Sequence, residues 1–254
     1  MSEPRREFQV ELPLGVVDES GHVHRQAVIQ KMRGHEEALF YDANLSPGRL
    51  VTELIRGCMV RLVDGPAVTG PLVSRMFSAD RNFLIVQIRR LALGDAVTCR
   101  YSCRSCGADI TVVEDLGRLE VRRAGEAALR PTFRVELEDG YRDTEGVTHT
   151  SLELRLPRGE DEEFISQVID SDPLRARDAL ILRCIHSFGT MRRSLFEAHG
   201  LKLLRDLTLG DRRRIYRALD DDSPGVNFRR TITCDRCGEQ FKAVLEVSSF
   251  FDLG

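Results

Sequence analysis

The sequence predicts an α+β protein in which helices and two β-hairpins are inserted around a small β module, itself split between the middle and the end of the chain. Two motifs of the form Cys-x-x-Cys-Gly lie 131 positions apart, at residues 103–107 and 234–238. Segments typical of strands flank both motifs. The remaining sequence divides into helical patterns and two further alternating hairpins.

The four motif cysteines predict a metal site. Two Cys-x-x-Cys pairs supply the sulfurs of a closed zinc site, and the glycine after each pair can take the positive φ of a tight turn. We therefore expect Cys103, Cys106, Cys234 and Cys237 to bind one structural Zn2+ in a split four-cysteine zinc ribbon. A closed four-thiolate site has no open position for substrate, which favours architecture over catalysis. The alternatives are a redox dithiol, two separate sites, or unmetallated thiols.

The other cysteines and a His-x-His pair have structural interpretations. Cys58 and Cys184 fall on apolar helical faces and are expected in the core. Cys99 shares a strand side with Cys103, so the alternative to an ordinary strand cysteine is a replacement ligand. His22 and His24 share one strand face; a solvated face is favoured over a second metal site.

Composition bounds the class of protein. A chain of 254 residues with 42% hydrophobic content can bury a core. Seven cysteines, four of them in metal-like pairs, suit a reducing compartment better than a disulfide scaffold. No apolar run approaches the ~18 residues of a membrane span, and the first residues lack an apolar signal core, so we expect a cytoplasmic protein. A net charge of −3 gives no broad attraction to nucleic acid or membranes.

Local patterns predict the elements between these landmarks. Two hairpins are expected, over residues 7–31 and 132–156, with a charged connector over 116–130. Ser46-Pro47 and Asp172-Pro173 each predict a helix start, and Ser78 is expected to cap a further helix. The predicted helices cover 34–41, 47–58, 80–93, 160–169 and 173–185, and Thr208-Leu209-Gly210-Asp211 precedes another that runs through 219.

These elements suggest four segments. They are an N-terminal hairpin with helices (1–77), a helix with the first cysteine knuckle (78–115), an inserted hairpin with helices (116–205), and a helix with the second knuckle (206–254). Phe250 and Phe251 either fill the core or anchor a partner, and the core is favoured. A short echo, Leu-x-Leu-Gly-Asp at 91–95 and 207–211, is too brief to establish a duplication.

Several short blocks together resemble a known family. They are Leu12-Pro13-Leu14-Gly15, Gly21-His22-Val23-His24, Gly34-His35-Glu36-Glu37, Ala79-Asp80-Arg81-Asn82-Phe83, Leu93-Gly94-Asp95, Leu154-Arg155-Leu156-Pro157 with Asp161, both knuckles, and the Phe250-Phe251 tail. These blocks resemble the baseplate or hub-assembly proteins of contractile phage tails and phage-tail-like injection systems. The resemblance implies protein partners in a baseplate, hub or spike complex. It also implies either that the protein is a subunit of the finished particle or that it acts only during assembly. Residues 116–150 carry no such block.

Three classes of function compete. The resemblance favours a non-enzymatic structural or assembly (chaperone-like) protein with a structural zinc. The alternative is a zinc-ribbon nucleic-acid-binding or regulatory protein, with Arg212–Arg214 and Arg229-Arg230 beside Phe228 as its best basic patch; acidic net charge and the absence of Trp argue against it. An enzyme is the weakest expectation, because no catalytic motif is present and no catalytic residue or small-molecule substrate is nominated.

Overall fold

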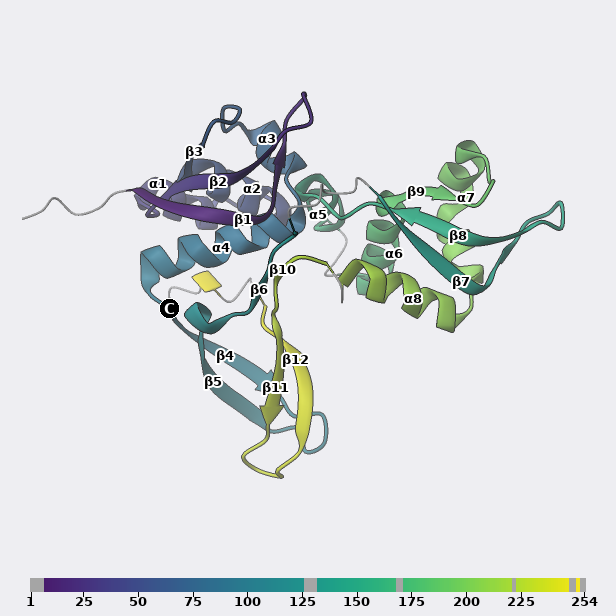
Figure 1. The fold of residues 1–254 in the computed structure, drawn as a ribbon. Helices are drawn as coiled ribbons and strands as arrows, with labels where there is room; N and C mark the ends of the chain where they lie inside the picture. Colours follow the sequence, from purple (N-terminus) through teal and green to yellow (C-terminus); the bar gives the residue numbers. More distant parts are fainter. Residues whose placement is uncertain (1–6, 126–131, 168–170, 221–222, 247–249, 252–254) are drawn as a thin grey trace, which may run out of the picture.

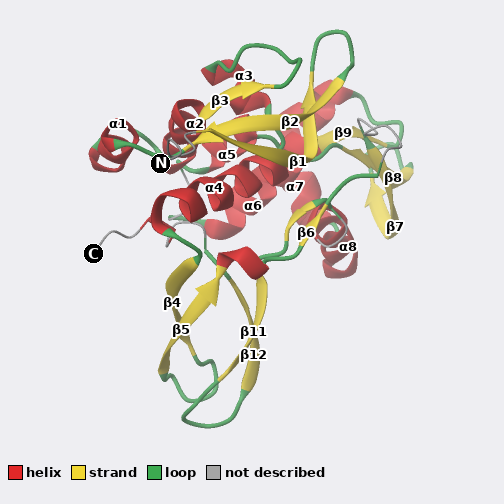
Figure 2. Cartoon of the chain, turned by 60° about the vertical axis from the view of Figure 1, so that its left-hand side comes forward, coloured by secondary structure: helices red, strands yellow, loops and turns green. Residues whose placement is uncertain are grey.

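The structure is a computed structural model, which describes residues 7–125, 132–167, 171–220, 223–246 and 250–251. It is a mixed α+β protein with several small antiparallel sheets (Figure 1). Two helix-and-sheet bodies lie side by side, and two hairpins project together from beneath them (Figures 1 and 2). No helix among the described residues combines the length and the apolar character needed to cross a membrane.

The first half of the chain begins with a hairpin and ends with another. Its elements are β1 (Glu7–Val17), β2 (Val23–Gln30), α1 (Gly34–Glu37), η1 (Ala38–Tyr41), α2 (Pro47–Cys58), β3 (Met59–Leu62), α3 (Gly70–Arg75), α4 (Ser78–Leu93), β4 (Ala96–Ser102) and β5 (Asp109–Asp115). A short connector with η2 (Leu116–Arg118) and β6 (Val121–Arg122) follows. Strands β1, β2 and β3 form one sheet in that order, and β4 pairs with β5.

The second half repeats this order, without a counterpart of η1 and with one additional short strand, β10. Its elements are β7 (Phe133–Arg142), β8 (Thr148–Leu154), α5 (Gly159–Ile165), α6 (Pro173–Cys184), β9 (Ile185–Phe188), α7 (Arg193–Asp206), α8 (Leu209–Asp220), β10 (Gly225–Val226), β11 (Arg229–Thr233) and β12 (Gln240–Val244). Strands β7, β8 and β9 again form a three-stranded sheet in chain order, and β11 pairs with β12. We call residues 7–115 the first repeat and 133–244 the second repeat.

Strand register shows that the first hairpins of the two repeats, β1–β2 and β7–β8, are equivalent residue by residue. The β1–β2 register slips between the pairs Glu11–Gln26 and Val16–His24. The β7–β8 register slips between Glu136–Ser151 and Tyr141–His149, each residue 125 positions later. A shared bulge at the same place, in sheets of the same topology, is a feature of one fold used twice.

A buried carboxylate fixes this bulge in each repeat. Asp80, in the first turn of α4, accepts hydrogen bonds from the backbone N–H groups of Leu14 (2.8 Å) and Gly15 (2.9 Å). Asp211, in the first turn of α8, accepts from Gly140 (2.9 Å), the residue equivalent to Gly15, and from its two predecessors. The bulge N–H groups cannot join the strand ladder, so the carboxylate replaces that pairing.

The hairpin turns are also equivalent. Asp18 Oδ2 lies 2.9 Å from His24 Nε2, and Asp143 Oδ2 lies 2.9 Å from His149 Nε2. In both turns the aspartate also accepts backbone N–H groups from the residues that follow it. These bonds keep the carboxylates ionised and lower the pKa of both Asp18 and Asp143.

Each repeat has its own hydrophobic core, and α5 of the second repeat joins them. The first core is built on β1–β3, α2 and α4 and includes Phe250 from the end of the chain. The second core is built on β7–β9 with α6, α7 and α8. Helix α5 also packs against α2, α3 and α4 of the first repeat, so it lies at the junction (Figure 1).

Most predicted elements are confirmed, with three local differences. Both hairpins and the helix starts at Ser46 and Asp172 are observed, and each of these two side chains accepts a backbone N–H as N-cap. Ser78 is not a cap: Phe77 holds the N-cap position and Ser78 is the first helical residue. Helices α3 and α7 and the short strands β3 and β9 were not predicted. The helix predicted over 160–169 is α5, which ends at Ile165; position 169 lies outside the described residues.

Candidate metal centre

Two identical knuckles hold the motif cysteines. In the first, the N–H of Gly107 donates to the carbonyl of Cys103 (2.9 Å), and the N–H of Cys103 donates to Ala108 (2.9 Å). The second repeats these bonds from Gly238 to Cys234 and from Cys234 to Glu239 (both 2.8 Å). Both glycines have a positive φ, 66° and 74°, a conformation that a Cβ would strain. The hydrogen bonds and the glycine that shape each knuckle therefore all come from its own local sequence.

The structure brings all four predicted cysteines together. Their sulfur atoms lie within 4.8 Å of one another, and no other metal-ligand cluster involves the described residues. Cys103 Sγ lies 3.7 Å from Cys237 Sγ, and Cys106 Sγ lies 3.6 Å from Cys234 Sγ. Ligands about 2.3 Å from a tetrahedral zinc are about 3.8 Å apart, so the donor set fits that ion.

Electrostatics explain why this cluster suits a cation. Backbone N–H groups of Cys106 and Ser105 are the main cause that lowers the pKa of Cys103 to about 7. The N–H of Glu239 favours the thiolate of Cys237, but burial and the three neighbouring sulfurs outweigh it and raise the pKa of Cys237 to about 12. Sulfurs this close cannot all be anionic without a nearby positive charge.

Each repeat supplies one knuckle, on the paired hairpins β4–β5 and β11–β12 (Figure 2). A small apolar cluster lies between the hairpins, formed by Ile110 and Ile232 with Tyr101 and Phe241 at its edge. Arg230 of β11 is paired with Glu114 of β5 (Nε–Oε2, 3.1 Å). The hairpins therefore have few contacts other than the cysteine cluster to hold them together.

The remaining cysteines and histidines take no part in the cluster. Cys58 and Cys184 are buried in helices, as predicted, and Cys99 is a buried strand residue of the first core. Burial raises the pKa of both Cys58 and Cys184 to about 12, so these thiols are inert. His24 is paired with Asp18, and His22 and His24 belong to no group of three or more potential metal ligands among the described residues.

The predicted basic patch is largely internally paired. Arg212 lies 2.6 Å from Asp178, Arg214 is paired with Glu138, and Arg230 is paired with Glu114. Guanidinium groups held by carboxylates do not offer a free surface for phosphates.

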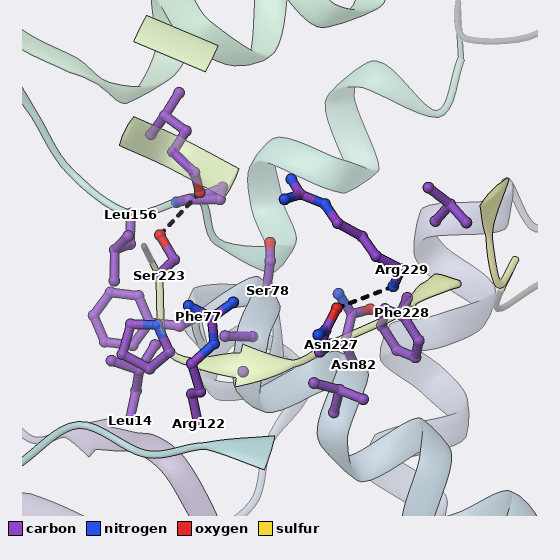
Figure 3. A pocket seen from close by; sticks show the side chains of 17 residues that line it. Leu14, Phe77, Ser78, Asn82, Arg122, Leu156, Ser223, Asn227, Phe228 and Arg229 are labelled. Atoms are coloured by element: carbon purple, nitrogen blue, oxygen red, sulfur yellow. Dashed lines mark hydrogen bonds between the residues drawn. The ribbon is translucent and has the colours of Figure 1, made fainter. Parts of the chain in front are cut away.

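A cavity of about 300 Å3 lies where the first repeat, the connector and the second repeat meet (Figure 3). Ser78 and Asn82 of α4, Arg122 of β6, Asn227 before β11 and Arg229 of β11 contribute its polar groups. The backbone N–H of Arg229 donates to Asn227 Oδ1 (3.1 Å), which orders this wall. The lining contains no acid, histidine or cysteine within the described part of the chain, so it offers no carboxylate pair for acid–base chemistry.

The chain is therefore a two-repeat α+β protein whose repeats meet at a helix junction and at a four-cysteine cluster. Comparison with known families then places the sequence. Residues 29–252 match the family described as T4 bacteriophage base plate protein, and the chain belongs to that family. No curated protein and no solved structure matches the chain.

Proposed function

We propose that this chain is a non-enzymatic structural or assembly protein of a contractile, phage-tail-like baseplate, with its shape fixed by one structural zinc ion. The zinc would be held by Cys103, Cys106, Cys234 and Cys237. Membership of the base plate family supports the place of action, and the convergence of four sulfurs from both repeats supports the metal. The partners are then other proteins of the baseplate, its hub or its central spike.

The physical role of the metal is a cross-link between repeats. When bound, zinc supplies four strong bonds to thiolates and no reactive position. Closing a loop of more than a hundred residues contributes about 4–5 kcal/mol in the chain-entropy model. A domain's whole net stability is about 5–15 kcal/mol, so one such bond set decides whether the two hairpins stay together.

One experiment distinguishes an assembly factor, which is absent from the finished particle, from a structural subunit, which remains in it. Particles are purified from a strain that carries the wild-type gene and from one that encodes Cys103→Ser/Cys234→Ser, and their proteins are quantified by mass spectrometry. A structural subunit is present in fixed proportion in wild-type particles, whereas an assembly factor is absent from them. In either case the variant strain should yield about tenfold fewer complete tails. Normal numbers of complete tails in a deletion strain would refute the proposal.

A further inference from the structure

The junction between the repeats is built around a buried arginine. Arg81 of α4 is fully buried, and its Nε donates to Glu162 Oε2 of α5 (3.0 Å). Its Nη1 donates to the carbonyl of Val73 (3.1 Å) and to Thr52 Oγ1 (2.8 Å), and its Nη2 donates to the carbonyl of Gly48 (3.3 Å). The next residue, Glu163, accepts from Thr52 and Ser74. The acidic first turn of α5 is therefore the group that covers this face of the first repeat.

The second repeat contains the equivalent face. Arg212 lies 131 positions after Arg81, and it donates to the carbonyl of Leu204 (3.0 Å), the residue 131 positions after Val73. It also donates to Asp178 (2.6 Å), which lies where Thr52 lies in the first repeat. Asp178 therefore supplies, from within the same repeat, the negative charge that Glu162 supplies across the junction. The arginine here needs no incoming acid.

This second face is exposed and partly apolar. Leu174 is 52% exposed and Leu209 is 63% exposed, and both begin the helices whose Asp178 and Arg212 are paired. Their counterparts in the first repeat, Gly48 and Ser78, are buried beneath the α5 segment. Arg205, whose counterpart is Ser74, is 55% exposed beside Asp178. We call Leu174, Arg175, Arg205 and Leu209 the outer face.

In a protein built from repeats, exposed leucines on the outer face indicate whether another molecule covers that face. In stacked repeats, the terminal repeat has a polar outer surface when it ends the stack, because nothing covers it. The outer face instead presents two leucines, rimmed by arginines, where the first repeat presents Gly48 and Ser78 to α5. An apolar centre with a charged rim is typical of a surface that another molecule covers.

The complementary segment is present at the other end of the same chain. Helix α1 is equivalent to α5: Arg33 N–H donates to Glu36 (2.9 Å) as Arg158 N–H donates to Asp161 (2.9 Å). None of the α1 residues is buried, and Tyr41 just beyond it is 75% exposed. Glu37, the counterpart of Glu162, is exposed and can face the arginines of the outer face. The chain therefore exposes two surfaces, the outer face and helix α1, whose counterparts contact each other at the internal junction.

We infer that the outer face binds the α1–η1 segment (residues 34–41) of a second copy of this chain, head to tail. The contact differs from the internal junction in one respect. A Cβ at Gly48 would lie 2.5 Å from the Cα of Glu163, so α5 sits directly on the glycine. Leu174 at the equivalent place keeps an incoming segment further away and replaces that close approach with apolar contact. We expect a small, reversible interface, which can extend from copy to copy because it is heterologous.

The test uses two full-length variants, each altered on one side of the interface. Leu174→Asp/Leu209→Asp changes the outer face, with both acids at helix N-terminal positions that tolerate them. Glu37→Arg/Tyr41→Ser changes the α1–η1 segment. Sedimentation velocity from about 1 to 100 µM should show self-association of the wild type and a dissociation constant at least about tenfold weaker for each variant alone.

Mixing the two variants distinguishes this arrangement from a symmetric dimer in which either altered surface contacts its own copy. An equimolar mixture retains one intact pair of surfaces, so it should form heterodimers with wild-type affinity and stop at that size. Val147→Asp, an exposed apolar residue at a hairpin tip, is the matched control and should associate as the wild type does. A wild type that stays monomeric across the range, or a mixture that associates no better than either variant, would overturn the inference.

Discussion

At the scale of single residues, the contribution of the four knuckle cysteines to metal binding can be separated from that of the other thiols. Cys234 is 1% exposed and lies 3.6 Å from Cys106 Sγ, so Cys234→Ser removes a donor that no neighbour can replace. We expect purified Cys234→Ser to lose its bound zinc, because three thiolates and a hydroxyl bind it far more weakly. Metal content is measured by inductively coupled plasma mass spectrometry.

The control is Cys99→Ser, which changes a buried cysteine of the first core outside the cluster. This variant should lose some stability through poorer packing but keep one zinc per chain. Equal loss of metal from both variants would make Cys99 a ligand and contradict the assignment of the four knuckle cysteines.

A second residue-scale prediction concerns Asp161. Burial by itself would raise the pKa of this carboxyl, but hydrogen bonds from Arg155, the N–H of Arg158 and Arg183 lower it below its ordinary value. Asp161→Asn leaves two arginines without their buried partner and should cost about 3–5 kcal/mol of unfolding free energy. Urea denaturation at neutral pH measures the loss.

The sign of the pH dependence follows from the lowered pKa. The stabilisation by Asp161 is complete above the unfolded-state pKa of about 4 and is lost as the pH falls through the lower folded-state value. The wild type should therefore lose stability more steeply than Asp161→Asn below about pH 4. Asp95→Asn, at an exposed ion pair with Arg90, is the control and should change stability by less than about 1 kcal/mol. If the free energy of unfolding fell equally steeply with pH in the wild type and in Asp161→Asn below about pH 4, this explanation would be contradicted.

At the scale of elements, the two bulge-binding aspartates should behave alike. Asp80→Ala leaves two buried backbone N–H groups unpaired and Asp211→Ala leaves three. Each should destabilise the chain by about 2–4 kcal/mol, since an unsatisfied buried donor costs roughly 1–3 kcal/mol. Thermal or urea unfolding checks this, with the exposed Glu145→Ala as control. A neutral result at either position would show that the two repeats do not use this carboxylate equivalently.

Elements with a strong local signal could be predicted from the sequence, and those set by tertiary contacts could not. Ser46-Pro47 and Asp172-Pro173 marked helix starts because capping is a local interaction. Strands β3 and β9 are four residues each and become strands only by pairing with β2 and β8. Ser78 has the chemistry of a cap, but the N-cap position lies one residue earlier, at Phe77, in a helix whose Asp80 and Arg81 face inward.

At the scale of the whole molecule, the repeat was visible in the sequence only in the wrong register. The Leu-x-Leu-Gly-Asp echo places 91–95, the end of α4, beside 207–211, the start of α8. The structural equivalents are Asp80 with Asp211 and Cys103 with Cys234, each 131 positions apart, and few other side chains are identical between them. Each repeat keeps the backbone hydrogen bonds to its buried aspartate and the backbone hydrogen bonds within its cysteine knuckle, whereas the side chains on the surrounding surfaces differ between the repeats.

The connection of the two repeats predicts how the molecule responds to metal removal. Apart from the cysteines, the contacts between the hairpins β4–β5 and β11–β12 include a small apolar cluster and the Arg230–Glu114 ion pair. Chelation should therefore lower the melting temperature by on the order of 10 °C, since about 4–5 kcal/mol of cross-link is lost. Added zinc should restore it. An unchanged melting temperature in protein shown to be metal-free would mean that the apolar contacts alone hold the repeats.

The most direct test of the central claim is X-ray absorption at the zinc K-edge on the purified full-length protein. One zinc per chain, surrounded by four sulfur atoms at about 2.3 Å and by no nitrogen or oxygen, is the predicted result. A zinc bound through nitrogen or oxygen, or protein purified without any metal and stable in that state, would contradict the account.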